Sequence, residues 1–246
     1  MSDQNAFQVG QLSSNPTSGH WDMAGGAKFV YEFTVGENSN MNLSITDVVG
    51  DVQLDLYKDN GDGKFNASDT FRDESDRPGN RDEAINRFDG AGRYFAVVYN
   101  NSLTTDAHYN FTLSATTHNS VLASNLLPTE FNLGTVDKTH PAIQTLFLGD
   151  GNNADTFAFH LDKTSNIHLL LQQGGTILGA QGDSDVRIGQ DTNHDRIIQD
   201  TEIIGFSNNL GNADDKIDQS LIAGDYFVQV YQFKGNIHPT LQLSVS

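Results

Sequence analysis

The fold is decided by a nine-residue stretch, Ala91-Gly92-Arg93-Tyr94-Phe95-Ala96-Val97-Val98-Tyr99, which recurs as Ala223-Gly224-Asp225-Tyr226-Phe227-Val228-Gln229-Val230-Tyr231. The two copies lie 132 residues apart (223 − 91). A turn recurs at the same offset, because residues 79–85 (GNRDEAI) match residues 211–217 (GNADDKI). A fixed offset between similar segments indicates a repeated structural unit. The 246 residues therefore contain two copies of one domain.

Apolar and polar residues alternate in segments on both sides of this stretch. Residues 31–35 match 157–161, and residues 41–45 match 167–171. A period of two is typical of a strand with one buried face, and short strands between Gly, Asn and Asp turns are typical of a β-sandwich. We therefore predict an all-β fold of two tandem antiparallel β-sandwich domains, residues 1–117 and 131–246, with a linker at 118–130.

The predicted linker lacks the alternation of the segments on either side. It includes Pro128, and its leucines, Leu122, Leu126 and Leu127, are too apolar for a free tether. Either the two domains pack on each other through this segment, or the segment caps one of them.

The strongest chemical signal is a twelve-residue stretch in the second copy, residues 191–202 (DTNHDRIIQDTE). Oxygen-bearing side chains stand at positions 1, 3, 5, 9 and 12, which are Asp191, Asn193, Asp195, Gln199 and Glu202, and Ile197 at position 7 offers its backbone carbonyl. This is the ligand spacing of an EF-hand calcium loop. Arg196 stands at position 6, where glycine is usual, and a positive φ there costs about 1 kcal/mol.

A related loop occupies the matching place in the first copy, at residues 58–69 (KDNGDGKFNASD). It aligns with the second loop at an offset of 133 (193 − 60), and Gly63 restores the usual turn residue. Its candidate ligands are Asp59, Asn60, Asp62, Asn66 and Asp69, with the backbone carbonyl of Lys64.

The first ligand position of this loop is altered, because Lys58 stands there and Asp59 follows one residue late. Val52 also lies one residue farther from Asn60 than Val186 lies from the matching Asn193. Two interpretations remain open. A bulge moves Asp59 into the first ligand position, or the loop is a weakened or empty site in which the Lys58 ammonium replaces part of the cation. The second loop is the better candidate by its sequence.

Acidic residues recur after each loop, at Asp82 and Glu83 and again at Asp214 and Asp215. These carboxylates either complete the coordination of a cation or accept backbone hydrogen bonds in a turn. Ordinary solvated hairpin turns are also rich in Asn, Asp and Gly. They rarely combine acidic and amide residues at positions 1, 3, 5 and 12, so we favour cation binding.

The composition argues against several classes of function. The formal net charge is −18, from 32 acidic and 14 basic residues, which argues against nucleic acid or an anionic membrane as a partner and favours cations. Cysteine is absent, so the chain has no disulfide and no zinc-thiolate site. No apolar run is long enough for a membrane span, and the N-terminus lacks the pattern of a classical export signal.

Catalytic motifs are not evident in the sequence. The eight histidines form no His-Glu-x-x-His pair, and there is no Gly-x-Ser-x-Gly elbow. His194, at position 4 of the second loop, is expected to point outward. An enzyme of unrecognised type would need clustered carboxylates in a cleft away from both loops.

The chain also resembles a known family. The succession of strand, Asp/Asn-rich loop, Gly-Asn-x-Asp-(Asp/Glu) turn and Ala-Gly-x-Tyr-Phe-x-x-x-Tyr resembles the bacterial pre-peptidase C-terminal domain, in two tandem copies over almost the whole chain. The resemblance implies a compact jelly-roll-like β-sandwich, related in fold to the calcium-dependent collagen-binding domain of clostridial collagenases. In that family the module accompanies secreted proteases and other exoenzymes, assists secretion, folding or substrate binding, and is not catalytic.

Residues 60–69 are separately similar to a dockerin calcium loop, apart from the missing first Asp. Because no dockerin helices are evident, this likeness is local and does not imply cohesin binding.

From these observations we expect a non-enzymatic protein in which Ca²⁺ stabilises the two sandwiches and supports binding to an extracellular protein or glycan. We expect it to be exported, although the missing export signal leaves a cytoplasmic location open. One alternative is a bacterial calcium sensor or buffer, which needs a Kd in the micromolar range or tighter, whereas extracellular modules work at about 0.1 to 1 mM. Another is a C-terminal accessory region of a secreted protease.

Overall fold

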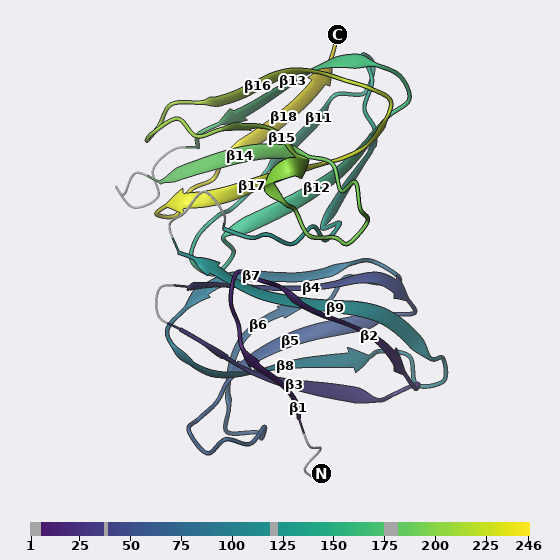
Figure 1. Ribbon diagram of the computed structural model, residues 1–246, viewed down its shortest axis with the longest axis vertical. Helices are drawn as coiled ribbons and strands as arrows, with labels where there is room; N and C mark the ends of the chain where they lie inside the picture. The colour runs from purple at the N-terminus through teal and green to yellow at the C-terminus, as the bar shows by residue number, and fades with distance from the viewer. Residues whose placement is uncertain (1–5, 37–38, 119–122, 175–181) are drawn as a thin grey trace. The chain divides into compact units, whose positions relative to one another are not determined.

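The computed structural model describes residues 6–36, 39–118, 123–174 and 182–246 (Figure 1). The chain divides into two compact units, Met1–His118 and Asn119–Ser246. Helical structure in the described ranges is a single 3₁₀ turn, η1 (Asp200–Glu202). No helix in these ranges is long and apolar enough to cross a membrane.

The first unit is a sandwich of two sheets. The five-stranded sheet has the order β1-β3-β8-β5-β6, and the four-stranded sheet has the order β2-β9-β4-β7. The strands are β1 (Phe7–Gln11), β2 (Thr17–Met23), β3 (Lys28–Val35), β4 (Ser39–Val49), β5 (Val52–Lys58), β6 (Thr70–Ser75), β7 (Glu83–Asp89), β8 (Gly92–Asn100) and β9 (Ala107–Thr117).

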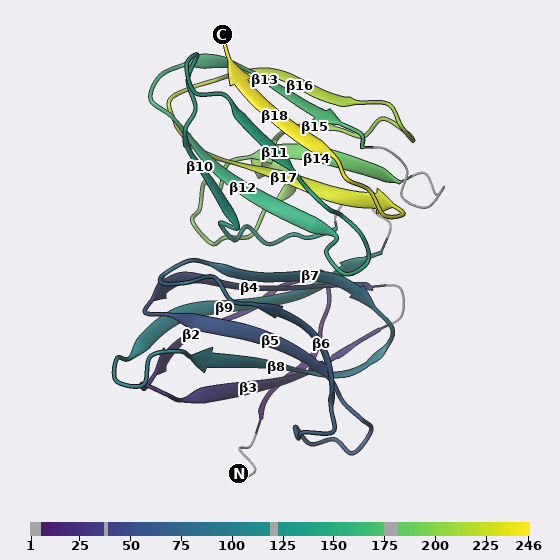
Figure 2. The same cartoon turned by 180° about the vertical axis from the view of Figure 1, so that it is seen from behind.

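The second unit repeats this topology strand for strand (Figure 2). Its sheets have the orders β10-β12-β17-β14-β15 and β11-β18-β13-β16. The strands are β10 (Phe131–Thr135), β11 (Ala142–Thr145), β12 (Ala154–Leu161), β13 (Ser165–Gln172), β14 (Asp183–Gly189), β15 (Ile203–Ser207), β16 (Asp215–Leu221), β17 (Gly224–Lys234) and β18 (Thr240–Val245). The predicted all-β sandwich fold is confirmed.

One edge of each five-stranded sheet departs from the predicted antiparallel pattern. β1 pairs in parallel with β3, and β10 pairs in parallel with β12. The intervening strand, β2 or β11, belongs to the opposite sheet. The chain therefore crosses over and returns in the same direction, which is the connection that parallel pairing requires.

The alternating residues face the space between the sheets, as their period of two requires. In β4 the side chains of Met41, Leu43 and Ile45 are fully buried in the first core, and β13 places Ile167 and Leu169 in the second. Fully burying a side chain of this size contributes about 1.5–3 kcal/mol. These two cores hold the strands that carry the loops described below.

The segment that precedes β10 packs on the second unit. Leu127 lies in a cluster with Ile198 and Phe227, and Ala123 packs with Ala154 and Tyr231. Described residues 123–130 thus cap the second domain, which is one of the two arrangements predicted for this segment. Leu122 lies outside the described residues.

Candidate metal centres

Both predicted calcium loops leave an interior strand of the five-stranded sheet and return along its edge. The first loop joins β5 to β6, and the second joins β14 to β15. Leu54 in β5 and Val186 in β14 stand opposite equivalent residues of β8 and β17, at an offset of 132 (186 − 54). Strand pairing therefore places Asp59 at the position of Asp191, which has the same offset.

This register corrects the alignment of the strand that leads into the first loop. Aligning Val52 with Val186 puts one extra residue before the loop, but the β5–β8 pairing is regular and contains none. The loop itself is one residue shorter, because Asp59 is followed directly by Asn60 and Thr192 has no counterpart. Asp59 reaches the first ligand position without a bulge in the β5–β8 pairing.

Hydrogen bonds assign Asp59 the same role as Asp191. The Asp59 carboxylate accepts from the Gly63 N–H at 3.2 and 3.3 Å. The Asp191 carboxylate accepts from the N–H groups of Asp195 at 3.2 Å and Arg196 at 3.1 Å. In both loops, the first acidic residue thus accepts from the backbone of the turn at position 6.

The Lys58 ammonium points away from the first loop's ligands. Its Nζ donates to the Gly90 carbonyl at 3.3 Å and lies 3.7 Å from an Asp89 carboxylate oxygen. It also lies 5.1 Å from the centroid of the Tyr94 ring. The interpretation in which Lys58 replaces part of the cation therefore has no support in this arrangement.

Side-chain acceptors turn the rest of the first loop inward. Asn60 Oδ1 accepts from the Asp62 N–H at 3.0 Å, and Asp62 Oδ1 accepts from the Lys64 N–H at 2.9 Å. Asp69 accepts from the N–H groups of Asn60 at 3.1 Å and Asn66 at 2.7 Å. The Asn66 amide donates to Asp62 Oδ2 and to the Lys64 carbonyl, both at 2.9 Å. The predicted ligand groups at positions 5, 7 and 9 are thus already in contact.

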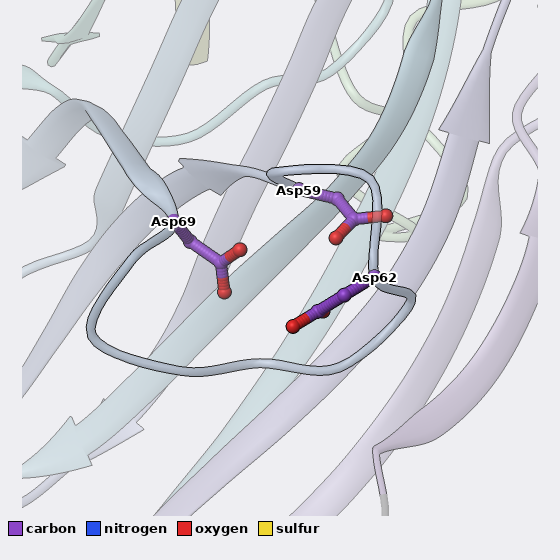
Figure 3. Close-up of side chains that lie close together, drawn as sticks. All are labelled: Asp59, Asp62 and Asp69. Atoms are coloured by element: carbon purple, nitrogen blue, oxygen red, sulfur yellow. The ribbon is translucent and has the colours of Figure 1, made fainter.

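Three carboxylates converge in this loop. Oxygen atoms of Asp59, Asp62 and Asp69 lie within 4.8 Å of one another. Figure 3 shows the three side chains around this loop. Within the described ranges this is the one group of three acidic, histidine or cysteine side chains that gathers so closely. Each pair of unit charges at this separation repels by about 1 kcal/mol in water-like surroundings, so a cation between them would be stabilised.

The second loop has the same backbone contacts as the first. Its carboxylates, however, do not form a group of three as close as that of the first loop. Asp195 Oδ1 accepts from the Ile197 N–H at 2.8 Å, and Glu202 accepts from the N–H groups of Thr192 at 2.7 Å and Gln199 at 3.2 Å. Burial would raise the pKa of Glu202, but hydrogen bonds from Thr192 and Gln199 outweigh it and hold that pKa below its usual value. The loop with the better sequence is therefore not the one whose acidic oxygens gather most closely.

Position 6 has a positive φ in both loops, as the sequence predicts. Gly63 has φ 74° and Arg196 has φ 60°. Position 4 is similar, with φ 104° at Gly61 and 60° at His194, which is exposed as expected. The first loop meets this requirement with glycines, whereas the second places His194 and Arg196 in the left-handed region.

Two of the recurring acidic residues after the loops, Glu83 and Asp215, accept hydrogen bonds that stabilise turns. Glu83 accepts from Ser75 Oγ at 2.5 Å and from the Arg77 N–H at 2.8 Å. Asp215 accepts equivalently from Ser207 Oγ at 2.6 Å and from the Asn209 N–H at 2.8 Å. The turn interpretation therefore accounts for both residues. Burial raises the pKa of Glu83 to about 7.

A buried acidic patch in the second domain is absent from the sequence-based predictions. Asp183, Asp185 and Asp215 are each at most 4% exposed. Burial, together with the charges of Asp183 and Asp215, raises the pKa of Asp185 to about 7. The sequence does signal this patch weakly, because Asp183 and Asp185 stand at the start of a strand that continues with the apolar Val186 and Ile188.

One hydrogen-bonded Ser-His-Asp arrangement lies on the second domain. His168 Nε2 is 2.8 Å from Ser246 Oγ, and His168 Nδ1 is 2.6 Å from Asp218 Oδ1. The Ser246 N–H, a potential oxyanion donor, is used by the Asn166 carbonyl, and the His168 and Asp218 side chains are 48% and 73% exposed. An effective triad needs an oriented, sheltered acid and free oxyanion donors. Here the acid, Asp218, is exposed, and the Ser246 N–H is already used.

Comparison with known proteins gives remote likenesses. No family model and no curated protein matches the sequence. Among solved structures, the pre-peptidase C-terminal domain of a collagenase from Bacillus anthracis matches 48% of this chain and 97% of that chain, with 17% identity and a TM-score of 0.35. The lysozyme inhibitor PliG from Aeromonas hydrophila matches 45% of this chain and 97% of its own, with 14% identity and a TM-score of 0.34. Likenesses this distant carry no argument about function.

Proposed function

We propose that this chain is a non-enzymatic calcium-binding protein in which Ca²⁺ in two equivalent loops stabilises two β-sandwiches. The observation that carries the proposal is the convergence of the Asp59, Asp62 and Asp69 oxygens within 4.8 Å, in a loop whose backbone N–H groups orient all three carboxylates. The second loop supports it through the same pattern of contacts from Asp191 to Glu202.

The donor set fits a hard cation. The proposed ligands are all oxygen atoms, which suit Ca²⁺ and not the softer metals that prefer thiolate or imidazole. In the first loop they are Asp59, Asn60, Asp62, Asn66 and Asp69 with the Lys64 carbonyl. In the second they are Asp191, Asn193, Asp195, Gln199 and Glu202 with the Ile197 carbonyl. The amides at position 9 now donate to an acidic ligand and would rotate to present oxygen.

The cation would stabilise each sandwich through the apolar residue at loop position 8. Phe65 packs against Phe95 and Tyr57 on the first sheet, and Ile198 packs against Phe227 on the second. Neutralising the carboxylates keeps the loop closed over these contacts. A ligand that binds only the folded state adds about 2.7 kcal/mol at a hundredfold excess over its Kd.

The wider role we propose is that of an exported accessory module of pre-peptidase C-terminal type, whose contact with an extracellular protein or glycan depends on calcium. The charge of −18 supports a cation-loaded surface and opposes nucleic acid as a partner. Affinity separates this role from a cytoplasmic sensor or buffer. A Kd near 0.1 to 1 mM fits the accessory module, and a Kd in the micromolar range or tighter fits the sensor.

Calorimetric titration of the intact chain with Ca²⁺ tests the proposal. We expect two binding events and a higher Tm than in chelator. Asp62→Ala should remove one event and Asp195→Ala the other, whereas the exposed acidic residues outside the loops, in Asp22→Ala and Asp162→Ala, should leave both unchanged. Absence of binding heat, together with a Tm that chelator does not alter, would contradict the proposal.

The non-enzymatic part of the proposal has its own test. We expect no labelling of the chain by a fluorophosphonate probe, because Asp218 is exposed and the Ser246 N–H is used by the Asn166 carbonyl. Labelling that disappears in Ser246→Ala and in His168→Ala would show a working nucleophile and overturn this part.

A further inference from the structure

The second loop is joined by its backbone to the segment that leads into the second domain. Leu126 and Ile197 form an isolated antiparallel bridge. The Leu127 N–H donates to the Arg196 carbonyl at 2.8 Å, and the Ile198 N–H donates to the Asn125 carbonyl at 3.0 Å. The loop therefore supplies a short strand on which the segment pairs.

Side chains reinforce this pairing. Arg196 Nη1 donates to the Leu127 carbonyl at 3.3 Å and to Thr129 Oγ1 at 3.2 Å. Its guanidinium carbon lies 5.5 Å from the centroid of the Phe227 ring, and Leu127 is fully buried between Ile198 and Phe227. The Arg196 side chain thus contacts the segment, which gives a reason for a non-glycine residue at this turn.

Residues 196–198, on which the segment pairs, also lie inside the proposed cation loop. Ile197 stands at position 7, where the backbone carbonyl is a ligand. Its N–H is already bound by Asp195 Oδ1 at 2.8 Å, and Asp195 is itself a proposed ligand. A cation that holds the Ile197 carbonyl and the Asp195 carboxylate therefore fixes the backbone of 196–198, on which the segment pairs.

The first loop offers a comparison without this connection. Gly63 replaces Arg196, and Phe65 covers Phe95 with its own ring. Among the described residues, Gly63–Phe65 forms no isolated bridge with a neighbouring segment. Cation binding at the first loop should accordingly stay local.

We propose that cation binding at the second loop locks the segment 123–130 onto the second domain, so that calcium sets where that folded unit begins. This inference rests on the calcium binding proposed above. Coupling between the two is reciprocal, so a firmly docked segment also raises the affinity of the loop for the cation. Calcium would then determine whether residues 123–130 are held on the second domain.

Other contacts anchor part of the segment independently of the loop. Arg187 Nη2 donates to the Ser124 carbonyl, and Gln229 Nε2 donates to the Leu126 carbonyl at 3.2 Å. The amide of Leu127 is the more selective reporter, because its acceptor is the Arg196 carbonyl in the loop itself.

Hydrogen exchange of the intact chain, with Ca²⁺ or with chelator, tests the inference. We expect Ca²⁺ to slow exchange at the Leu127 amide about tenfold, within the usual range of coupling between sites. Asp195→Ala should abolish this slowing, and Asp62→Ala, the matched change in the first loop, should preserve it.

Reciprocity provides a second measurement. Leu127→Ala removes the buried contact of the segment and should weaken Ca²⁺ binding at the second loop several-fold while the first loop keeps its affinity. Binding heat from the second loop with no change in Leu127 exchange would overturn the inference while leaving calcium binding intact. Absence of that binding heat would overturn both.

Discussion

The two loops occupy equivalent positions in equivalent sheets, but they differ in the residues at their turns and in the placement of their carboxylates. The first loop is shorter by one residue, turns on Gly61 and Gly63, and gathers three carboxylates. The second turns on His194 and Arg196, disperses its carboxylates, and uses Arg196 to hold the segment before β10. The first arrangement brings three carboxylates together, and the second connects the loop to a neighbouring segment through Arg196, a residue with a positive φ.

The largest expected effect comes from the aromatic residue beneath each loop. Phe95 is fully buried and Phe227 is 9% exposed, at equivalent positions of β8 and β17. Phe95→Ala and Phe227→Ala should each reduce the free energy of unfolding of their own domain by about 3–5 kcal/mol. Calorimetry should show one thermal transition lowered in each variant and the other unmoved.

These two variants also sharpen the comparison. Phe227→Ala should release the segment as well, and so expose the Leu127 amide to exchange, whereas Phe95→Ala should leave that amide protected. Equal protection of Leu127 in both variants would show that Phe227 does not support the segment.

The next effect concerns pH and two buried acids, Glu83 and Asp185. Burial raises the pKa of Glu83 and of Asp185 to about 7. Because the folded protein binds these protons more tightly than the unfolded chain does, their contribution to stability is complete at low pH and is lost as pH rises toward 7. In chelator, Glu83→Gln and Asp185→Asn should each flatten the decline between pH 4.5 and 7 by about 2 kcal/mol.

Urea unfolding at several pH values measures this effect. Arg77 acts against burial and lowers the pKa of Glu83, whereas the charge of Asp183 acts with burial and raises the pKa of Asp185. The second domain should therefore depend more steeply on pH than the first. An identical slope in both domains would contradict this difference.

The sequence alone predicted much of this comparison, because its evidence was local. Alternation in segments such as 41–45 predicted strands with one buried face, and the offset of 132 predicted equivalent domains with equivalent loops. A positive φ at Arg196 followed from the turn that the ligand spacing requires.

Other features depended on pairing across sheets, which no local pattern encodes. The alignment through Asn60 concealed the missing loop residue, because only the register of β5 against β8 shows that Asp59 replaces Asp191. The burial of Asp185 and the parallel pairing of β1 also depend on contacts between strands that are distant in the sequence. The connection from Arg196 to Leu127 links residues far apart in the chain, so no motif could reveal it.

A smaller effect is expected at position 6. Gly63→Ala should destabilise the first domain by about 1 kcal/mol through its positive φ, and its Cβ would also displace the Arg93 guanidinium. Arg196→Gly relieves a similar strain but loses two hydrogen bonds and a ring contact, each worth about 0.5–1.5 kcal/mol. We expect a net loss near 1 kcal/mol by urea unfolding. A gain in stability would mean that Arg196 contributes nothing to the segment.

The smallest expected effect is the backbone strain at position 4, which can be measured there without the loss of side-chain contacts. His194 is exposed and has φ 60°, a conformation that a histidine adopts at low cost, whereas Gly61 has φ 104°, outside the region open to other residues. A Cβ at Gly61 would meet no atom within 4 Å, so any cost of Gly61→Ala is a backbone cost.

We expect Gly61→Ala to lower the unfolding free energy of the first domain by about 1 kcal/mol. His194→Gly should change that of the second by only a few tenths, because relief of strain is offset by the added freedom of the unfolded chain. Urea unfolding in chelator isolates these terms from cation binding, and equal losses in the two variants would show that the loops do not differ in backbone strain at this position.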